Sequence, residues 1–152
     1  MKKLLALCIV GVLIGCASAP ARHAGETDAK MNDLVLYALS LAETPYSFGG
    51  NNPNRGFDCS GYVGHVFRHE LNLSLPRTSK AISRVGQPVS KSELRLGDLV
   101  FYNTLRDPFS HVGIYIGEGK FVHSPKSGDR IRVEQMDLRY WQTRYNGARR
   151  MR

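Results

Sequence analysis

The sequence predicts an α+β domain in which helices come first and antiparallel strands follow. Apolar residues recur at helical spacing between residues 29 and 67. After residue 97, short segments rich in Val, Ile, Phe and Tyr are separated by Gly or Pro, as in strands joined by tight turns. Because helical and strand segments do not alternate along the chain, we expect the helices to pack on an antiparallel sheet.

The first 15 residues have the pattern of a secretory signal. Lys2 and Lys3 precede an apolar run from Leu4 to Ile14. This run is shorter than the about 20 apolar residues that span a bilayer, and it matches the apolar core of a signal peptide. The motif that closes it resembles a bacterial lipobox, whose cysteine is lipidated and becomes the mature N-terminus: Leu13-Ile14-Gly15-Cys16. An ordinary signal peptide with a chance cysteine is the alternative.

We expect residues 16–28 to form a flexible tether between a lipid on Cys16 and a domain that spans residues 29–152. The tether is rich in Ala, Ser, Gly and charged residues and has no periodicity. Ala17, rather than Asp, follows the cysteine. By resemblance to such lipoproteins, this suggests sorting to the outer membrane, on the side that faces the periplasm.

The charge of the chain is basic and fits an exported protein that meets polyanions. Without Lys2 and Lys3, the 21 basic residues fall to 19 against 13 acidic ones, a net charge of +6. In a cytosolic protein this surplus would favour nucleic acid, but the signal argues against that partner. Cell wall and anionic lipid headgroups are the polyanions outside the cytoplasm, and basic charge raises encounter rates with both.

Three helices are predicted in the first part of the domain. The first runs from Ala29 to Glu43 and ends before Pro45. Residues 46–57 form a loop rich in Gly and Asn. The second helix begins around Cys59, and a short third helix covers residues 79–85. The second helix carries a stripe of apolar residues that we expect to be buried: Tyr62, Val63, Val66 and Phe67.

The second part of the domain is predicted to form four strands and a closing helix. A turn at residues 94–97 leads into the first strand. Residues 136–145 form the closing helix, with Trp141 packed inward. The predicted strands are Asp98 to Tyr102, Val112 to Ile116, Lys120 to His123 and Arg130 to Glu134.

Cys59 is the candidate nucleophile. Cys8 leaves with the signal and Cys16 carries lipid, so Cys59 remains without a disulfide partner. It lies at the predicted start of a helix, where backbone N–H groups and the helix dipole stabilise a thiolate and lower the pKa of the thiol. The same N–H groups can bind an oxyanion. A buried, inert core cysteine is the alternative.

His111 and His123 are the candidate base and its orienting partner, because each lies at the end of a predicted strand. Between the strands, residues 117–119 form the turn. With a three-residue loop, His123 lies opposite Gly113, and the two histidines share one face of the sheet on a diagonal that their side chains can bridge. A two-residue loop would place them on opposite faces. Two edge histidines that face water are the alternative.

The remaining histidines give no metal site. His65 and His69 are four residues apart on the second helix, a spacing that can hold a metal, and His23 lies in the tether. Zinc needs further ligands, and the sequence offers no set that completes the site. We therefore interpret His65 and His69 as solvated residues of a helix face, and we expect no metal and no organic cofactor.

Five separated motifs follow one another along the domain: Asp58-Cys59-Ser60-Gly61, Leu75-Pro76-Arg77-Thr78-Ser79, Gly97-Asp98-Leu99-Val100-Phe101, His111-Val112-Gly113-Ile114-Tyr115-Ile116-Gly117 and Phe121-Val122-His123. In this order they resemble the NlpC-type cell-wall peptidases. The likeness spans about Asp33 to Arg150, and the ending after Trp141 is similar to that of the Spr-type murein endopeptidase lipoproteins. The resemblance implies a papain-like fold and a Cys-His-His triad.

The resemblance also implies a role for each site residue. Cys59 attacks, His111 is the general base and His123 orients His111. Tyr46 matches the family tyrosine near the nucleophile, and with Ser60 it is a candidate contact of the substrate or the oxyanion. Asp58 and Arg77 match family positions that flank the groove, without a catalytic role; Asp58 is a candidate helix cap. Phe48 stands where the family often has Trp.

The implied substrate is the stem peptide of peptidoglycan, cut through a thioester that water hydrolyses. The Spr-like ending favours the cross-link between D-alanine and meso-diaminopimelate. The bond between D-glutamate and meso-diaminopimelate is the alternative, because no motif reports the stereochemistry of the groove. A non-catalytic wall-binding lipoprotein and an acyltransferase or amidase on the same scaffold are further alternatives. We expect a monomer.

Overall fold

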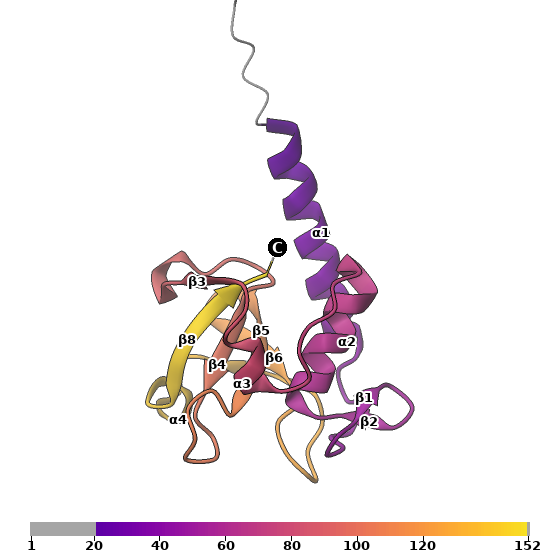
Figure 1. Ribbon diagram of the computed structural model, residues 1–152, viewed down its shortest axis with the longest axis vertical. Coiled ribbons are helices and arrows are strands. Elements are labelled where there is room, and N and C mark those ends of the chain that lie inside the picture. Colours follow the sequence, from indigo (N-terminus) through magenta and orange to yellow (C-terminus); the bar gives the residue numbers. More distant parts are fainter. Residues whose placement is uncertain (1–20, 152) are drawn as a thin grey trace, which may run out of the picture.

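A computed structural model describes residues 21–151 of the chain, with side chains from residue 25 onward. The predicted signal (residues 1–15), Cys16 and residues 17–20 lie outside this range. Within it, a six-stranded antiparallel sheet packs against two long helices, α1 and α2 (Figure 1). The predicted α+β class is confirmed. No helix of the described residues is long and apolar enough to cross a membrane.

Helix α1 (Ala21–Ser40) begins earlier than the predicted Ala29, so residues 21–28, which we expected in a flexible tether, are helical. Helical periodicity is absent from this segment because residues 25–30 are all exposed and bury no apolar stripe. Lys30 and Glu26 form an ion pair of 3.1 Å one turn apart, a spacing that stabilises an exposed helix by about 0.3 kcal/mol. In Figure 1 this part of α1 extends away from the sheet.

Helix α2 (Cys59–Leu71) begins at the predicted residue because Asp58 caps it. The Asp58 backbone is extended, and its Oδ1 accepts a hydrogen bond of 2.7 Å from the Gly61 N–H. The predicted apolar stripe of α2 is buried. At the other end, Asn72 adopts a left-handed conformation with φ of 51° and donates to the Arg68 carbonyl, which ends the helix.

The central sheet has the strand order β3-β8-β4-β5-β6-β7. Four of these strands match the predicted ones within two residues at each end. Strand β3 (Gln87–Val89) was not predicted. The matching strands are β4 (Leu99–Tyr102), β5 (His111–Gly117), β6 (Lys120–His123) and β7 (Arg132–Gln135).

The shorter elements connect these strands and helices. A small hairpin of β1 (Asn51–Asn52) and β2 (Gly56–Phe57) occupies the predicted loop before α2. Helix α3 (Ser79–Ile82) is capped by Thr78 and is shorter than predicted. A 3₁₀ turn, η1 (Lys91–Glu93), precedes β4.

The closing helix is largely a wrong prediction. Helix α4 (Arg139–Gln142) is a single turn, and strand β8 (Tyr145–Arg150) follows it and inserts between β3 and β4. The β8 segment has no β-branched residue, and only Ala148 is fully buried, so neither propensity nor alternation marks it as a strand. Trp141 packs inward as predicted and is 6% exposed.

The turn between β5 and β6 has two residues rather than the predicted three. Gly117 pairs with Lys120, and the turn residues Glu118 and Gly119 have φ of 51° and 69°, the positive values that a type I′ turn requires. A register shift between Tyr115 and Gly117 then restores the expected alignment, in which Ile114 pairs with Val122. The extra residue has moved from the loop into a bulge, and the register of the histidines is as predicted.

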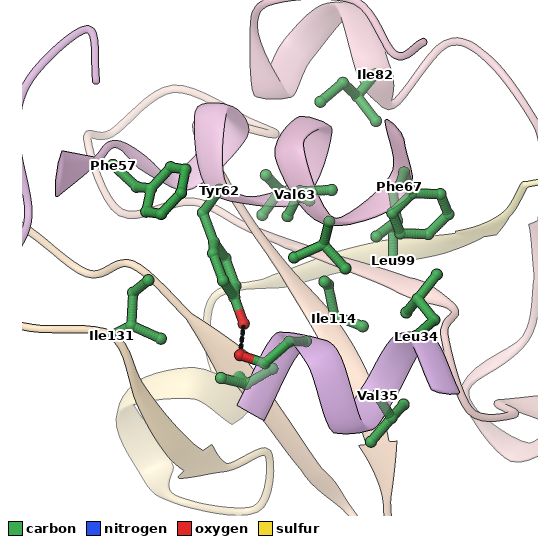
Figure 2. Close-up of a cluster of buried hydrophobic side chains, with 14 of the residues drawn as sticks. Leu34, Val35, Phe57, Tyr62, Val63, Phe67, Ile82, Leu99, Ile114 and Ile131 are labelled. Carbon is green, nitrogen blue, oxygen red and sulfur yellow. Dashed lines mark hydrogen bonds between the residues drawn. The ribbon is translucent and has the colours of Figure 1, made fainter. Parts of the chain in front are cut away.

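The first face of the sheet packs against α1 and α2 and forms the larger core. Figure 2 shows Leu34 of α1, Phe67 of α2 and Ile114 of β5 pointing into this core. Tyr62 crosses it, and its hydroxyl donates a hydrogen bond of 2.8 Å to the Ala38 carbonyl of α1 (Figure 2). This contact joins the two helices inside an otherwise apolar layer.

The second face of the sheet is smaller and more aromatic, and α4 covers it. Its buried cluster is Val100, Tyr102, Phe121, Met136, Trp141 and Ala148. Side chains alternate along a strand. His111, which pairs with Tyr102, and His123, two residues after Phe121, therefore point to this second face, whereas Val112 and Val122 point to the first.

Candidate active site

The predicted nucleophile and histidines lie at one end of the sheet. Cys59 is the first residue of α2, His111 is the first of β5, and His123 is the last of β6. Helix α2 packs on β5, and the N–H of Val112, the residue after His111, hydrogen-bonds to the Cys59 sulfur. The thiol therefore lies beside the start of β5, where His111 begins the strand.

Burial controls the protonation of the Cys59 thiol. Burial, and next the negative charge of Asp58, raise the pKa of this thiol to about 11, while the N–H groups of Val112, Ser60 and Cys59 itself lower it only in part. The prediction of a lowered pKa is wrong for the resting protein, because lost solvation outweighs the helix terminus. At neutral pH the sulfur keeps its proton.

The two histidine rings are in direct contact. His111 Nε2 and His123 Nδ1 are 2.6 Å apart and the rings are perpendicular. Both residues are buried, at 3% and 0% exposure. Gly113 makes room for them, since a Cβ there would lie 2.6 Å from the Phe121 ring and 3.2 Å from the His123 Cβ. The predicted contact between the rings is confirmed, and the alternative of water-facing histidines is excluded.

Both imidazoles are neutral at pH 7. Burial lowers the pKa of His111 to about 4. Burial, then the charges of His111 and Arg132, hold the pKa of His123 well below its usual value. A neutral imidazole carries one N–H, so the shared hydrogen bond couples the two tautomers. When His111 Nε2 donates to His123, the Nδ1 atom of His111 is free to accept a proton.

An ion pair fixes the segment around the nucleophile. Arg77 Nη1 and Nη2 bind Asp58 Oδ1 and Oδ2 at 2.9 and 2.6 Å. The Ser60 hydroxyl donates to the Arg77 carbonyl at 2.8 Å, and the Gly49 N–H donates to Asp58 Oδ2 at 3.1 Å. Burial by itself raises the pKa of Asp58, but the hydrogen bonds from Arg77 and Gly61 outweigh it and hold that pKa below its usual value. The network joins the loop before α2, the first turn of α2 and the segment before α3.

Tyr46 lies near both the thiol and the ion pair of Asp58 with Arg77. Its N–H donates to the Asp129 carbonyl at 2.9 Å, and its backbone bridges to Phe57, two residues before Cys59. Burial raises the pKa of the Tyr46 hydroxyl, and the charges of Cys59 and Asp58 add to this. Its hydroxyl is therefore within electrostatic reach of the thiol.

The sequence profile of the NlpC/P60 family matches residues 43–150, which hold the whole of this site. The chain belongs to the NlpC/P60 family. Solved structures of the family have the same fold: an NlpC/P60 family protein from Bacillus cereus superposes with a TM-score of 0.74 at 31% identity, covering 79% of this chain and 39% of that one. The NlpC/P60 domain of the peptidoglycan hydrolase SagA gives a TM-score of 0.69 at 28% identity, covering 80% and 98%.

Two curated relatives come from Escherichia coli. The murein DD-endopeptidase MepH is 43% identical over 128 residues, which are 82% of this chain and 46% of MepH. The protein named murein DD-endopeptidase MepS/murein LD-carboxypeptidase is 43% identical over 106 residues, which are 70% of this chain and 55% of that protein. The chain thus spans about half the length of the curated relatives it matches.

The other histidines of this NlpC/P60 domain are engaged with protein groups. His65 Nε2 lies 2.9 Å from the Tyr37 hydroxyl, and the His69 ring stacks on Tyr37 with 3.8 Å between centroids. His69 Nδ1 is 2.8 Å from Glu70 Oε1. These contacts join α1 to α2, so the interpretation as solvated residues holds in part. Among the residues that the structure describes, no group of three or more His, Cys, Asp or Glu could hold a metal ion.

Sequence reasoning missed the contacts of Arg77 and Trp141 with this site. Arg77 was assigned only to the edge of the groove, whereas it clamps the helix cap beside Cys59. Trp141 was expected in the core, but its indole also contacts the rings of His111 and His123. No sequence signal could have found these contacts, since both depend on how distant segments meet in space.

Proposed function

We propose that this chain is a peptidoglycan endopeptidase that cuts stem-peptide bonds with a Cys-His-His thiol mechanism. One observation carries the proposal: a buried hydrogen bond of 2.6 Å between His111 and His123 at the strand ends beside which the Cys59 thiol lies. A base held by a second group next to a nucleophile is the arrangement that covalent catalysis needs. Family membership and the named murein endopeptidase relatives support the substrate class.

The first step is proton transfer with attack. Because His111 Nε2 is occupied by His123, His111 Nδ1 is the nitrogen that takes the thiol proton. The pKa of the thiol is about 11 and that of His111 about 4, so this transfer is uphill in the resting protein. The Cys59 thiolate and the His111 imidazolium therefore form as the sulfur attacks the carbonyl carbon, with His111 as general base.

The next steps release the amine and then the acid. The N–H groups of Cys59 and Ser60, which lower the pKa of the thiol, donate to the oxyanion that forms on the attacked carbonyl, and the Tyr46 hydroxyl assists them. The Ser60 hydroxyl stays bound to the Arg77 carbonyl. Protonated His111 gives its proton to the leaving amine, which leaves a thioester on Cys59. Water, deprotonated by His111, hydrolyses the thioester and restores the thiol.

The bond that we propose is the cross-link between D-alanine and meso-diaminopimelate. The DD-endopeptidase names of MepH and MepS support it. The bond between D-glutamate and meso-diaminopimelate is the second candidate, because a Bacillus subtilis γ-DL-glutamyl hydrolase is 38% identical over 118 residues. Mass analysis of fragments from purified sacculi separates the two. Tetrapeptide monomers are the expected product, and dipeptide stems would favour the second bond.

The test of the activity compares the native chain with Cys59→Ala on sacculi. We expect fragment release to fall by more than about a thousandfold. His69→Ala is the matched control and keeps full release, since His69 lies on the exposed side of α2 near Tyr37. Equal release by Cys59→Ala and the native chain would refute the thiol mechanism. Unimpaired sacculus binding without any release by the native chain would favour a wall-binding protein instead, and transfer to an added amine would favour an acyltransferase.

We also propose that Cys16 carries lipid and anchors the protein, as a monomer, in the outer membrane on the periplasmic side. The lipobox-like motif before Cys16 supports this. Cys16→Ala is expected to move the protein from the membrane fraction to the soluble fraction and to lower wall turnover in cells, with no change in the purified enzyme. A membrane-bound Cys16→Ala protein would contradict the anchor.

A further inference from the structure

The His111–His123 pair lacks a carboxylate partner. In the described part of the chain, no carboxylate is hydrogen-bonded to either ring, and His123 Nε2 is buried without any hydrogen-bond partner. Arg132 pairs with His123 across β6 and β7, and the carboxylate beside Cys59, that of Asp58, is neutralised by Arg77. A neutral His123 can accept a hydrogen bond from protonated His111 but supplies no negative charge to it. Something else must stabilise the cation that the thiol mechanism creates.

Trp141 is placed to do this. Its indole lies nearly parallel to the His111 ring, with 5.8 Å between centroids and 25° between planes. It lies perpendicular to the His123 ring at 5.0 Å. The indole is 6% exposed, and Tyr102 and Phe121 hold it from β4 and β6 at 4.9 and 5.0 Å. The aromatic cluster therefore fixes the indole face against His111.

We propose that Trp141 is a positioning residue of the thiol mechanism: its indole face holds the His111 ring and stabilises the imidazolium form through a cation–π interaction. This inference rests on the proposed thiol mechanism. A cation within about 6 Å of a ring centroid is attracted by the ring's π electrons, most strongly by Trp, and more strongly away from water. Trp141 meets each of these conditions, so the aromatic face replaces the carboxylate that the pair lacks.

The interaction acts when the charge appears. In the resting protein both rings are neutral, and the indole contributes packing. When His111 takes the proton of Cys59, the new positive charge is spread over a ring that stacks on Trp141. An attraction that exists only for the charged form lowers the barrier rather than the ground state.

The test uses the fact that Trp141 is the single tryptophan of the chain. Biosynthetic replacement by 5-fluoro- and by 4,5,6,7-tetrafluorotryptophan changes this site alone, withdrawing π electron density with little change in volume. The readout is the rate at which iodoacetamide alkylates Cys59 at pH 7, followed by mass spectrometry of the peptide that carries it. We expect the rate to fall stepwise with fluorination, by about tenfold for the tetrafluoro protein, with an unchanged melting temperature.

An alkylation rate that does not change with fluorination, or does not follow the loss of π electron density from the indole, overturns the proposal. A contribution from packing alone would not depend on the electron density of the ring. If the tetrafluoro protein does not fold, Trp141→Phe and Trp141→Leu give the same decision: both are smaller than Trp and leave a cavity, and Phe must retain more alkylation than Leu. Equal rates for Phe and Leu overturn the proposal. Alkylation needs no peptidoglycan, so this outcome is separate from the sacculus test of the proposed function.

Discussion

The two faces of the sheet differ in composition and in what they do. The face toward α1 and α2 is built from aliphatic and aromatic side chains that are close to fully buried, and the Tyr62 hydroxyl inside it is hydrogen-bonded. The face toward α4 is smaller, and it holds both site histidines beside Tyr102 and Trp141. Helix α2 brings Cys59 from the first face, so the site forms at the strand ends where the two faces meet.

Several buried polar atoms without a hydrogen-bond partner lie on the second face. The Tyr102 hydroxyl and His123 Nε2 are buried there without a hydrogen-bond partner, and the Tyr145 hydroxyl lies beside them. Each such group costs about 1–3 kcal/mol. On the first face the Tyr62 hydroxyl donates to the Ala38 carbonyl and the Ser124 hydroxyl to the Phe57 carbonyl, and the Ser79 hydroxyl of α3 is the buried atom there that has no partner among the described residues. The comparison indicates that the first face provides stability, whereas the second gives up stability to hold neutral imidazoles.

The largest expected effect is a loss of stability from the first face. Phe67→Ala removes a ring that is 1% exposed and should lower the free energy of unfolding by about 3–5 kcal/mol. Activity per folded molecule should be unchanged at low temperature, because Phe67 lies toward the far end of α2 from Cys59. Urea unfolding and alkylation of Cys59 measure the two quantities. A loss of alkylation that matches the loss of stability would contradict the assignment of stability to the first face and of function to the second.

The second expected effect is acid instability from the second face. His111 has a pKa of about 4 when folded and an ordinary value of 6.5 when unfolded. Below pH 6.5 the unfolded chain therefore binds a proton that the folded one does not. Stability is full above pH 6.5 and is lost as the pH falls. By pH 5, His111 alone should remove about 2 kcal/mol, and His123 acts in the same direction.

Denaturant unfolding between pH 5 and 8 measures this loss. The His111→Gln substitution should remove the part of the pH dependence of the unfolding free energy that is due to His111. A native protein whose stability is level from pH 8 to pH 5 would contradict the neutral, buried state of the pair.

A third change should separate function from stability on the second face. Gly113→Ala places a Cβ 2.6 Å from the Phe121 ring and 3.0 Å from the Val122 carbonyl, so the neighbouring strand and His123 must shift. Overpacking of this kind costs about 1–3 kcal/mol of stability. Alkylation of Cys59 should fall by about a hundredfold, because a displaced base loses reactivity steeply. Gly64→Ala, where no atom lies within 4 Å of the new Cβ, is the control.

The smallest effect should come from the hydrogen bond inside the first face. Tyr62→Phe keeps the ring but leaves the Ala38 carbonyl without its donor. We expect a loss of about 1–2 kcal/mol in urea unfolding, with unchanged alkylation. A loss below experimental error would mean that water replaces the hydroxyl in this layer.

The sequence predicted the first face and the site better than the second face. The periodic stripe of α2 and the strands from Leu99 to His123 could be predicted, because burial imposes regular spacing on them. Strand β8 could not, since Asn146, Gly147 and Arg149 take their conformation from β3 and β4 on either side. The predicted closing helix was longer than α4, because the apolar residues of this segment belong first to a single helical turn and then to strand β8.

Within the site, residue identities were predictable but the electrostatics were not. The contact of His111 with His123 follows from strand alternation and the position of Gly113. The raised pKa of Cys59 does not follow from sequence, because it depends on how deeply the start of α2 is covered. A helix terminus can be recognised in a sequence, whereas the solvation of an atom depends on the whole fold.

The raised pKa of the Cys59 thiol has a consequence for its survival. Peroxides and disulfides react with thiolates, and a sulfur that retains its proton is a poor target for either. Cys59 is the only free cysteine among the described residues, so no other thiol of that part of the chain can repair it by exchange. The loss of solvation that makes its deprotonation uphill thus also slows its oxidation. Such a nucleophile can persist in an oxidising environment in a dormant form until a substrate carbonyl reaches it.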